Sequence, residues 1–214
     1  MDSNGCSTDH PSMERVHRSQ GPLVDTAGHK IEAHGAGLLL DPRTSRVYWF
    51  GESRKLSDFT THSIHCYSSN DLQRWRFEGI ALHSRDVRGL ENEAAGGWIL
   101  ERPKVLFNAI TNQYVMWSHL EGPATRPAHG SLPTWAHYRI GAAAVAIARH
   151  PAGPYTFVHA LRPVGGLLTF DASLFLDGGS AYRVQDVAHD SVGFYEVRIA
   201  RLASPLLTCI RMPS

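Results

Sequence analysis

The sequence is poor in cysteine, has no long apolar run and carries almost no net charge. Its three cysteines, Cys6, Cys66 and Cys209, lie far apart and show no C-x-x-C spacing, which argues against a disulfide framework and a structural zinc site. The longest small-apolar run, residues 140–148, falls well short of the roughly 20 residues that span a bilayer. A formal net charge of +1 gives no overall field to attract nucleic acid or an anionic membrane, so we expect neither as a partner.

Metal-binding and targeting motifs are also absent. The thirteen histidines are scattered, and none forms an H-E-x-x-H pair, so we expect no metal and no cofactor. Residues 1–22 are polar and lack the apolar core of a secretory signal. They are predicted to form a disordered leader before a single domain, 23–214. The sequence leaves the localisation open.

The dominant pattern is a series of β-hairpins. Three segments, 36–52, 103–119 and 172–186, each contain two apolar runs around a short polar turn. The returning strands carry Tyr48, Tyr114 and Tyr182, about 66 and 68 residues apart, which indicates an internal repeat. After each of the first two hairpins, an alternating strand is followed by a turn and a strand that begins with aromatic residues.

Four short strands in each repeat, without helices, are typical of a β-propeller blade. The chain supplies a little under three such blades, because residues 203–214 end before a convincing fourth strand of the third repeat. Closed propellers have about four to eight blades. The sequence therefore predicts an all-β, incomplete propeller, from a fragment or a shortened gene product. Uncovered blade edges would allow self-association.

Four motifs, in order, resemble glycoside hydrolase family 43, and within it the exo-acting galactan 1,3-β-galactosidases. They are IEAHGAGLLL, VYWFGES, CYSSNDLQRWRFEG and LERPKVLFNAITNQYVMWSH. A fifth phrase, HPAGPYTFV, is also similar to the family, and the resemblance runs from about residue 24 to about residue 182. It implies a five-bladed β-propeller, of which about three four-stranded blades are present, and an oligo- or polysaccharide as the partner.

The resemblance implies a set of site residues at the mouth of the propeller. Glu101 and Arg102 open the inner strand of the second blade before Pro103, whose missing N–H costs little at a strand start. The alternative for this pair is an ion pair that holds the blade in place. Asp171, in TFDASLF, is expected at the place in the third blade that is equivalent to Glu101, and it matches a family aspartate that holds the sugar and tunes the acid. Phe170 stands where the family usually has arginine, and a turn residue is the alternative for Asp171.

Three further positions complete the expected substrate-binding set: His34, Glu52 and His119. His34 stands where most of the family has an aspartate base and the galactosidase subgroup has histidine. A structural histidine and a hairpin cap are the alternatives for His34 and Glu52. Trp49 and Trp117 are expected in the core, and Tyr67 and Trp75 in packing.

The resemblance implies inverting hydrolysis, in which an acid protonates the leaving oxygen and a base activates water. The family's acid is a glutamate on a blade after that of Asp171. Here the only later glutamate is Glu196, whose surroundings do not resemble the acid motif. We therefore predict a galactan-directed glycoside hydrolase-like protein, with Glu101 and Asp171 as catalytic carboxylates, that is inactive if the acid's blade is missing. The alternative is a non-catalytic carbohydrate-binding or structural propeller fragment.

Overall fold

The structure is a computed structural model that describes residues 22–53, 63–88, 98–122, 140–162, 165–188, 195–203 and 209–210. Apart from Pro22, the leader predicted for residues 1–22 lies outside these ranges and stays a prediction. The described chain is almost entirely β-strand, with one 3-10 turn, η2 (Ser84–Asp86). This part of the chain contains no helix long and apolar enough to cross a membrane.

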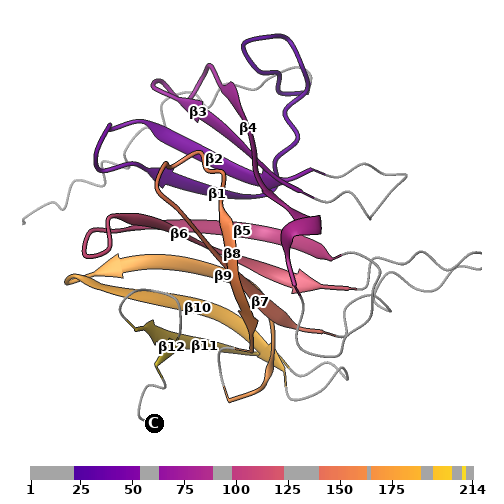
Figure 1. Ribbon diagram of the computed structural model, residues 1–214, viewed down its shortest axis with the longest axis vertical. Helices are drawn as coiled ribbons and strands as arrows, with labels where there is room; N and C mark the ends of the chain where they lie inside the picture. The colour runs from indigo at the N-terminus through magenta and orange to yellow at the C-terminus, as the bar shows by residue number, and fades with distance from the viewer. Residues whose placement is uncertain are drawn as a thin grey trace, which may run out of the picture.

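The described strands form three four-stranded antiparallel sheets, which follow one another along the chain (Figure 1). The first contains β1 (His34–Leu40), β2 (Val47–Glu52), β3 (Ser63–Ser69) and β4 (Arg76–His83). The second contains β5 (Ile99–Asn108), β6 (Gln113–Glu121), β7 (Ala142–Ala148) and β8 (Thr156–Leu161). The third contains β9 (Leu168–Asp177), β10 (Ser180–Ala188), β11 (Tyr195–Leu202) and β12 (Cys209–Ile210).

Within each sheet the strands pair in chain order, so each sheet is an up-and-down meander. This confirms the prediction of an all-β fold with about three four-stranded propeller blades. The third blade has a fourth strand that the sequence pattern did not reveal. That strand, β12, is only two residues long and pairs with Arg201 and Leu202 of β11, too short to show an alternating pattern.

The first strands of the three blades lie side by side at the centre of the arc. β1 packs beside β5, and β5 packs beside β9 (Figure 1). An alternating strand buries one face of its own sheet, and the faces of adjacent sheets meet between the blades. The first strand of each blade is thus its innermost strand and lies along the centre of the arc, as in a propeller.

Two apolar cores join the three blades. The larger lies between the first and second sheets and includes Phe50, Leu100 and Met116, all fully buried. The smaller joins the second sheet to the third and includes Trp117 and Val145. Burial of Trp117 confirms its predicted place in the core.

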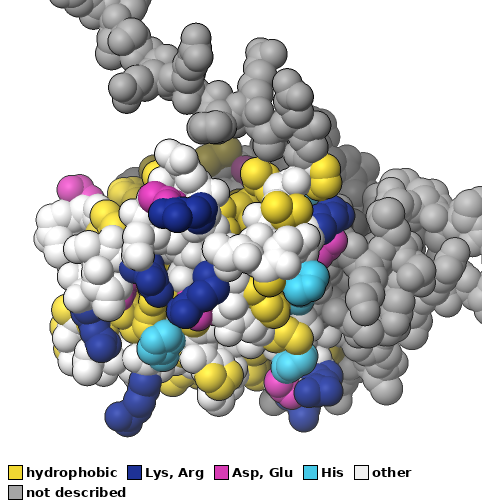
Figure 2. Space-filling view, turned by 90° about the horizontal axis from the view of Figure 1, so that it is seen from above, with side chains coloured by type: hydrophobic (Ala, Val, Ile, Leu, Met, Phe, Trp, Pro, Cys, Tyr) yellow, Lys and Arg dark blue, Asp and Glu magenta, His cyan; other side chains and the backbone are white. Residues whose placement is uncertain are grey.

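A third apolar cluster covers the outer face of the first blade. Ile31 and Ala33, which precede β1, pack there on Tyr67 and Trp75. Trp49 is half buried beside them, with its ring centroid 5.1 Å from that of Trp75. The packing roles predicted for Tyr67 and Trp75 are confirmed, whereas Trp49, which was expected in the core, is only partly buried. On this side of the molecule, acidic and basic side chains are interspersed with apolar ones (Figure 2), and the pairs Arg74–Asp71 and Arg76–Glu78 lie on this blade.

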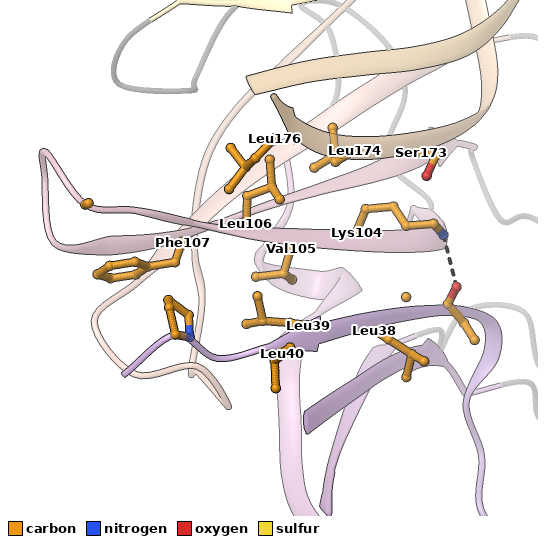
Figure 3. A pocket seen from close by; sticks show the side chains of 14 residues that line it. Leu38, Leu39, Leu40, Lys104, Val105, Leu106, Phe107, Ser173, Leu174 and Leu176 are labelled. Atoms are coloured by element: carbon orange, nitrogen blue, oxygen red, sulfur yellow. Dashed lines mark hydrogen bonds between the residues drawn. The ribbon is translucent and has the colours of Figure 1, made fainter. Parts of the chain in front are cut away.

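A cavity of about 780 Å³ runs along the three central strands and has a largely apolar lining (Figure 3). Leu38 and Leu40 from β1 and Leu176 from β9 line it and remain largely exposed. Lys104 lies at one end, where the polar site begins. Exposed apolar surface along the centre of the arc agrees with the expectation for an open set of blades.

Candidate functional site

The central strands share one irregularity, a β-bulge at the same ladder position. The residues just before the bulges pair with the second strands as His34 with Glu52, Glu101 with His119, and Thr169 with Val187. Two residues then lie opposite one before pairing resumes at Gly37, Lys104 and Ala172. Bulges redirect side chains and are common beside active sites. The three bulges therefore mark one end of the arc, the mouth, as the candidate site.

The bulges of β1 and β5 touch each other, and this contact requires glycine. Gly35 has a positive φ of 67°, and a Cβ there would lie 2.8 Å from Glu52 Oε1 and 3.2 Å from Arg102 Cα. Arg102 itself has a φ of 51°, a conformation that is uncommon for a residue with a side chain. Strained backbone of this kind is concentrated at functional sites.

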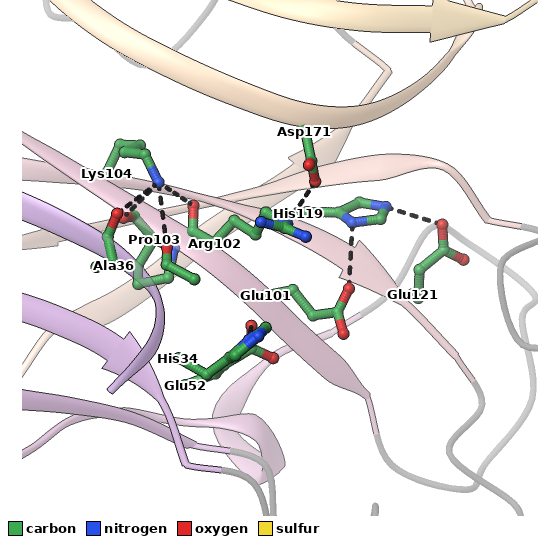
Figure 4. A network of polar contacts seen from close by, with 11 residues as sticks. His34, Ala36, Glu52, Glu101, Arg102, Pro103, Lys104, His119, Glu121 and Asp171 are labelled. Carbon is green, nitrogen blue, oxygen red and sulfur yellow. Dashed lines mark hydrogen bonds and ion pairs between the residues drawn. The ribbon is translucent and has the colours of Figure 1, made fainter. Parts of the chain in front are cut away.

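Lys104 holds the two bulges together. Its ammonium lies 3.2–3.4 Å from four backbone carbonyl oxygens, those of Gly35, Ala36, Arg102 and Pro103 (Figure 4). Burial and the nearby charge of Arg102 lower the pKa of Lys104. The lysine therefore has a structural role at the mouth, since its donors are directed to the backbone of both blades.

Arg102 connects the second blade to the third. Its Nε lies 2.6 Å from Asp171 Oδ1, and the two side chains are 41% and 51% exposed. Both were predicted as mouth residues, and the structure brings them together from β5 and β9 (Figure 4). A half-exposed guanidinium beside a half-exposed carboxylate offers donors and acceptors to a ligand with several hydroxyl groups.

Behind Arg102 lies a buried row of three ionisable side chains, those of Glu101, His119 and Glu121. His119 Nδ1 is 3.6 Å from Glu101 Oε2, and His119 Nε2 is 2.9 Å from Glu121 Oε1. Glu121 also accepts hydrogen bonds of 2.9 Å from the backbone N–H groups of Ile140 and Gly141. Burial disfavours the charged imidazole, but the hydrogen bonds and charges of the two glutamates outweigh it and raise the pKa of His119.

His34 and Glu52 form a second pair at the mouth, on the first blade. His34 Nδ1 lies 2.7 Å from Glu52 Oε1 (Figure 4). The histidine side chain is 49% exposed, whereas the glutamate is fully buried. Of these two predicted binding residues, His34 is therefore the one that faces solvent, and Glu52 orients its ring.

Solved structures share this arrangement of blades. An exo-β-1,3-galactanase from Phanerochaete chrysosporium with β-1,3-galactotriose superposes with a TM-score of 0.69 at 29% identity, over 89% of this chain and 40% of that one. A family 43 β-1,3-galactosidase with galactodeoxynojirimycin gives 0.65 at 30% identity, over 90% and 64%. An exo-β-1,3-galactanase from Clostridium thermocellum gives 0.67 at 26%, over 89% and 39%.

The chain has the blade arrangement of family 43 glycoside hydrolases, in particular of exo-β-1,3-galactanases and galactosidases. The predicted resemblance is thereby confirmed. The chain spans 40% of the Phanerochaete enzyme and 64% of the family 43 galactosidase. No family model matches it, and no curated protein does.

Two details of the repeat differ from the sequence-based prediction. Asp171 does not occupy the ladder position of Glu101: Thr169 does, and Asp171 lies in the bulge, as Pro103 does. Tyr48 pairs with Leu39 and lies one register step away from the position of Tyr114 and Tyr182, which pair with Phe107 and Phe175. A one-residue offset reverses the face of a strand, so spacing alone located the repeat but not its register.

Sequence reasoning missed Glu121 and Lys104 as members of this site. Glu121 is two residues after His119 on the same strand, and side chains at that spacing share one face. A histidine flanked in this way by an acid at the end of an apolar strand was an available signal. The role of Lys104 depends on the contact between two bulges, which no local pattern reveals.

The described residues of the mouth include no metal ligand set but do include one further acid, Asp186, which lines the same pocket as Arg102 and Asp171. No group of three His, Cys, Asp or Glu side chains in these ranges could hold a metal ion. Glu196 lies on β11, the third strand of its blade, where it pairs with Val187 of β10. Its carboxylate lies 2.9 Å from Arg198 Nε. Cys66 is a free, buried thiol, and burial raises its pKa.

Proposed function

We propose that the chain forms the galactose-binding mouth of a glycoside hydrolase that cleaves β-1,3-linked galactan from its chain end. The observation that carries the proposal is the meeting of Arg102 and Asp171, from two blades, beside the buried Glu101. Support comes from the solved family 43 structures, whose ligands are β-1,3-galactotriose, galactose and galactodeoxynojirimycin.

Each predicted residue has a role that suits its exposure. Asp171 and Arg102 are half exposed, so they bind hydroxyl groups of the terminal sugar and orient it. Glu101 lies behind them, 5% exposed, and presents its carboxylate to the sugar once Arg102 is engaged by ligand. His34, on the first blade, donates a hydrogen bond to a sugar hydroxyl or accepts one from it. His119 is too deeply buried to touch sugar and acts through Glu101.

Inverting hydrolysis also requires a proton donor for the leaving oxygen. In the proposed arrangement Asp171 is the carboxylate beside that donor, and the mouth residues hold the sugar ring in place for the attack of water. Correct positioning accounts for a large part of enzymatic rate enhancement. The activity of the whole enzyme therefore depends on this mouth whichever residue donates the proton.

The test measures binding and cleavage separately. The purified chain is titrated with β-1,3-galactobiose by calorimetry, and galactose release is followed with the same sugar. We expect binding that is weakened at least about tenfold by Glu101→Gln and by Asp171→Asn, the size of one lost charge-assisted contact. Glu78→Gln, on the outer strand of the first blade, is the matched control and should bind as the wild type does. Equal affinity in all four proteins would refute the proposal.

A second candidate function is binding of galactan without cleavage. It is favoured by the placement of Glu196, whose carboxylate is engaged by Arg198 two strands away from the central strand. Galactobiose binding without any galactose release would support this second function. Release that is lost in Glu101→Gln would exclude it.

A further inference from the structure

Glu121 is a buried carboxylate that has no part in the proposed sugar binding. It is the last residue of β6 and is fully buried. Oε1 accepts from Gly141 N–H and faces His119 Nε2, while Oε2 accepts from Ile140 N–H. Both carboxylate oxygens are therefore bound to groups whose positions are set by the backbone of the second blade.

His119 lies between this anchor and the mouth. Its two ring nitrogens face the carboxylates of Glu121 and Glu101, at 2.9 Å and 3.6 Å (Figure 4). Only the protonated imidazole can donate from both nitrogens. The ring plane is held from the third blade by Phe170, which packs edge-on with its centroid 5.6 Å away. The ladder partner on β7, Ala143, carries no charge.

We propose that Glu121 and His119 are positioning residues that hold the Glu101 carboxylate at the mouth. The inference rests on the proposed function, because Glu101 is the group that meets the sugar. The charge order acid–base–acid leaves one imidazolium between two carboxylates, an arrangement in which each buried charge has an opposite neighbour. Loss of the outer acid leaves His119 with Glu101 alone, free to rotate about its remaining contact.

The first test concerns the wild-type chain and needs no ligand. The ring nitrogens of His119 are observed by ¹⁵N NMR between pH 6 and 9 and assigned with His119→Gln. Both nitrogens are expected to keep their protons at pH values above the ordinary histidine pKa of about 6.5. A midpoint at or below that ordinary value would overturn the proposal, because a neutral imidazole cannot donate to both glutamates.

The second test separates positioning from folding. Glu121→Gln keeps the shape of the side chain and removes its charge. We expect the midpoint of the His119 titration to fall by about one pH unit or more, and galactobiose affinity to fall about tenfold. Glu78→Gln should change neither quantity. The positioning role would be refuted if Glu121→Gln left the His119 titration unaltered, or if the wild type bound galactobiose and Glu121→Gln bound it equally well. If the wild type binds no galactobiose, the proposed function is refuted, and the NMR titration alone then tests the positioning role.

Discussion

Arg102 of β5 and Asp171 of β9 form an ion pair of 2.6 Å between two blades that also share an apolar core. The pair lies at the bulges, where both strands leave their ladders. Each side chain is about half exposed, so the pair costs little to separate in water. A ligand can therefore replace the contact with its own hydroxyl groups, which distinguishes this pair from the buried ones behind it.

Substitution of either residue should affect ligand binding far more than stability. Arg102→Met and Asp171→Asn are each expected to change the free energy of unfolding by less than about 1 kcal/mol, because exposed ion pairs contribute little. Galactobiose affinity should fall at least about tenfold in each. Urea unfolding measures the first quantity and calorimetry the second.

The neighbouring pair on the third blade provides the control. Arg198→Met removes a similar, half-exposed ion pair with Glu196, which lies away from the three bulges that mark the mouth. It should leave both quantities unchanged. A loss of affinity as large as that of Arg102→Met would mean that basic charge in general, and not the mouth, binds the sugar.

Gly37 should be intolerant of any side chain, even a methyl group. An added Cβ would lie 2.1 Å from the carbonyl oxygen of Pro103, so β1 must move away from β5. Overpacking of this kind typically costs about 1–3 kcal/mol. Gly37→Ala should lower the urea midpoint and shift the backbone amide resonances of Lys104, on the facing strand.

Gly178, in the hairpin turn between β9 and β10, is the control for this steric argument. Nothing lies within 4 Å of its added Cβ, but its φ is 52°. Gly178→Ala should therefore cost backbone strain of about 1–2 kcal/mol and leave the resonances of β5 in place. Equal disturbance of β5 by both variants would contradict the steric argument for Gly37.

The sequence predicts the blades well because strand alternation and turns are local properties. Each of the three hairpins is present, and Trp117 and Trp75 pack as their apolar neighbours suggest. The register is less predictable, since a bulge adds one residue to one strand without changing its composition. This is why Asp171 lies in a bulge. Tyr48 is out of register with Tyr114 for another reason: it lies four residues before Glu52, whereas Tyr114 lies five residues before His119.

The site is predictable only as a set of residue types. Glu101, Arg102 and Asp171 were identified through family motifs, and the structure places all three at one end of the central strands. Which side chain faces solvent depends on packing between blades. That packing buries His119 and Glu52 and leaves His34 half exposed, a distinction that no spacing in the sequence contains.

A buried link between the first two blades should make a measurable contribution to stability. Tyr114 donates a hydrogen bond of 2.6 Å to Asp41 Oδ1, and Thr44 donates one of 2.6 Å to Oδ2. Burial alone would raise the pKa of Asp41, but these hydrogen bonds outweigh it and lower the pKa. Tyr114→Phe should cost about 1.5–3 kcal/mol at pH 7, as measured by urea unfolding.

The cost should shrink in acid. A carboxyl group with a lowered folded-state pKa stabilises the fold above its unfolded pKa of about 3.9, and this stability is lost as pH falls through the folded value. The difference between wild type and Tyr114→Phe should therefore narrow below about pH 4. Tyr182→Phe, which alters a half-buried tyrosine stacked on Phe175, should show no such dependence. A constant difference down to pH 2.5 would contradict the role of Asp41.

The opposite pH dependence is expected for His119. Its folded-state pKa is raised by Glu101 and Glu121 despite burial, so its contribution is complete below the unfolded pKa of about 6.5 and is lost as pH rises through the folded value. Between the two values, the stability difference between wild type and His119→Gln should decline by about 1.4 kcal/mol per pH unit. Urea unfolding from pH 5.5 to 9 measures this decline. A flat difference for His119→Gln would mean that the ring is not charged in the folded protein.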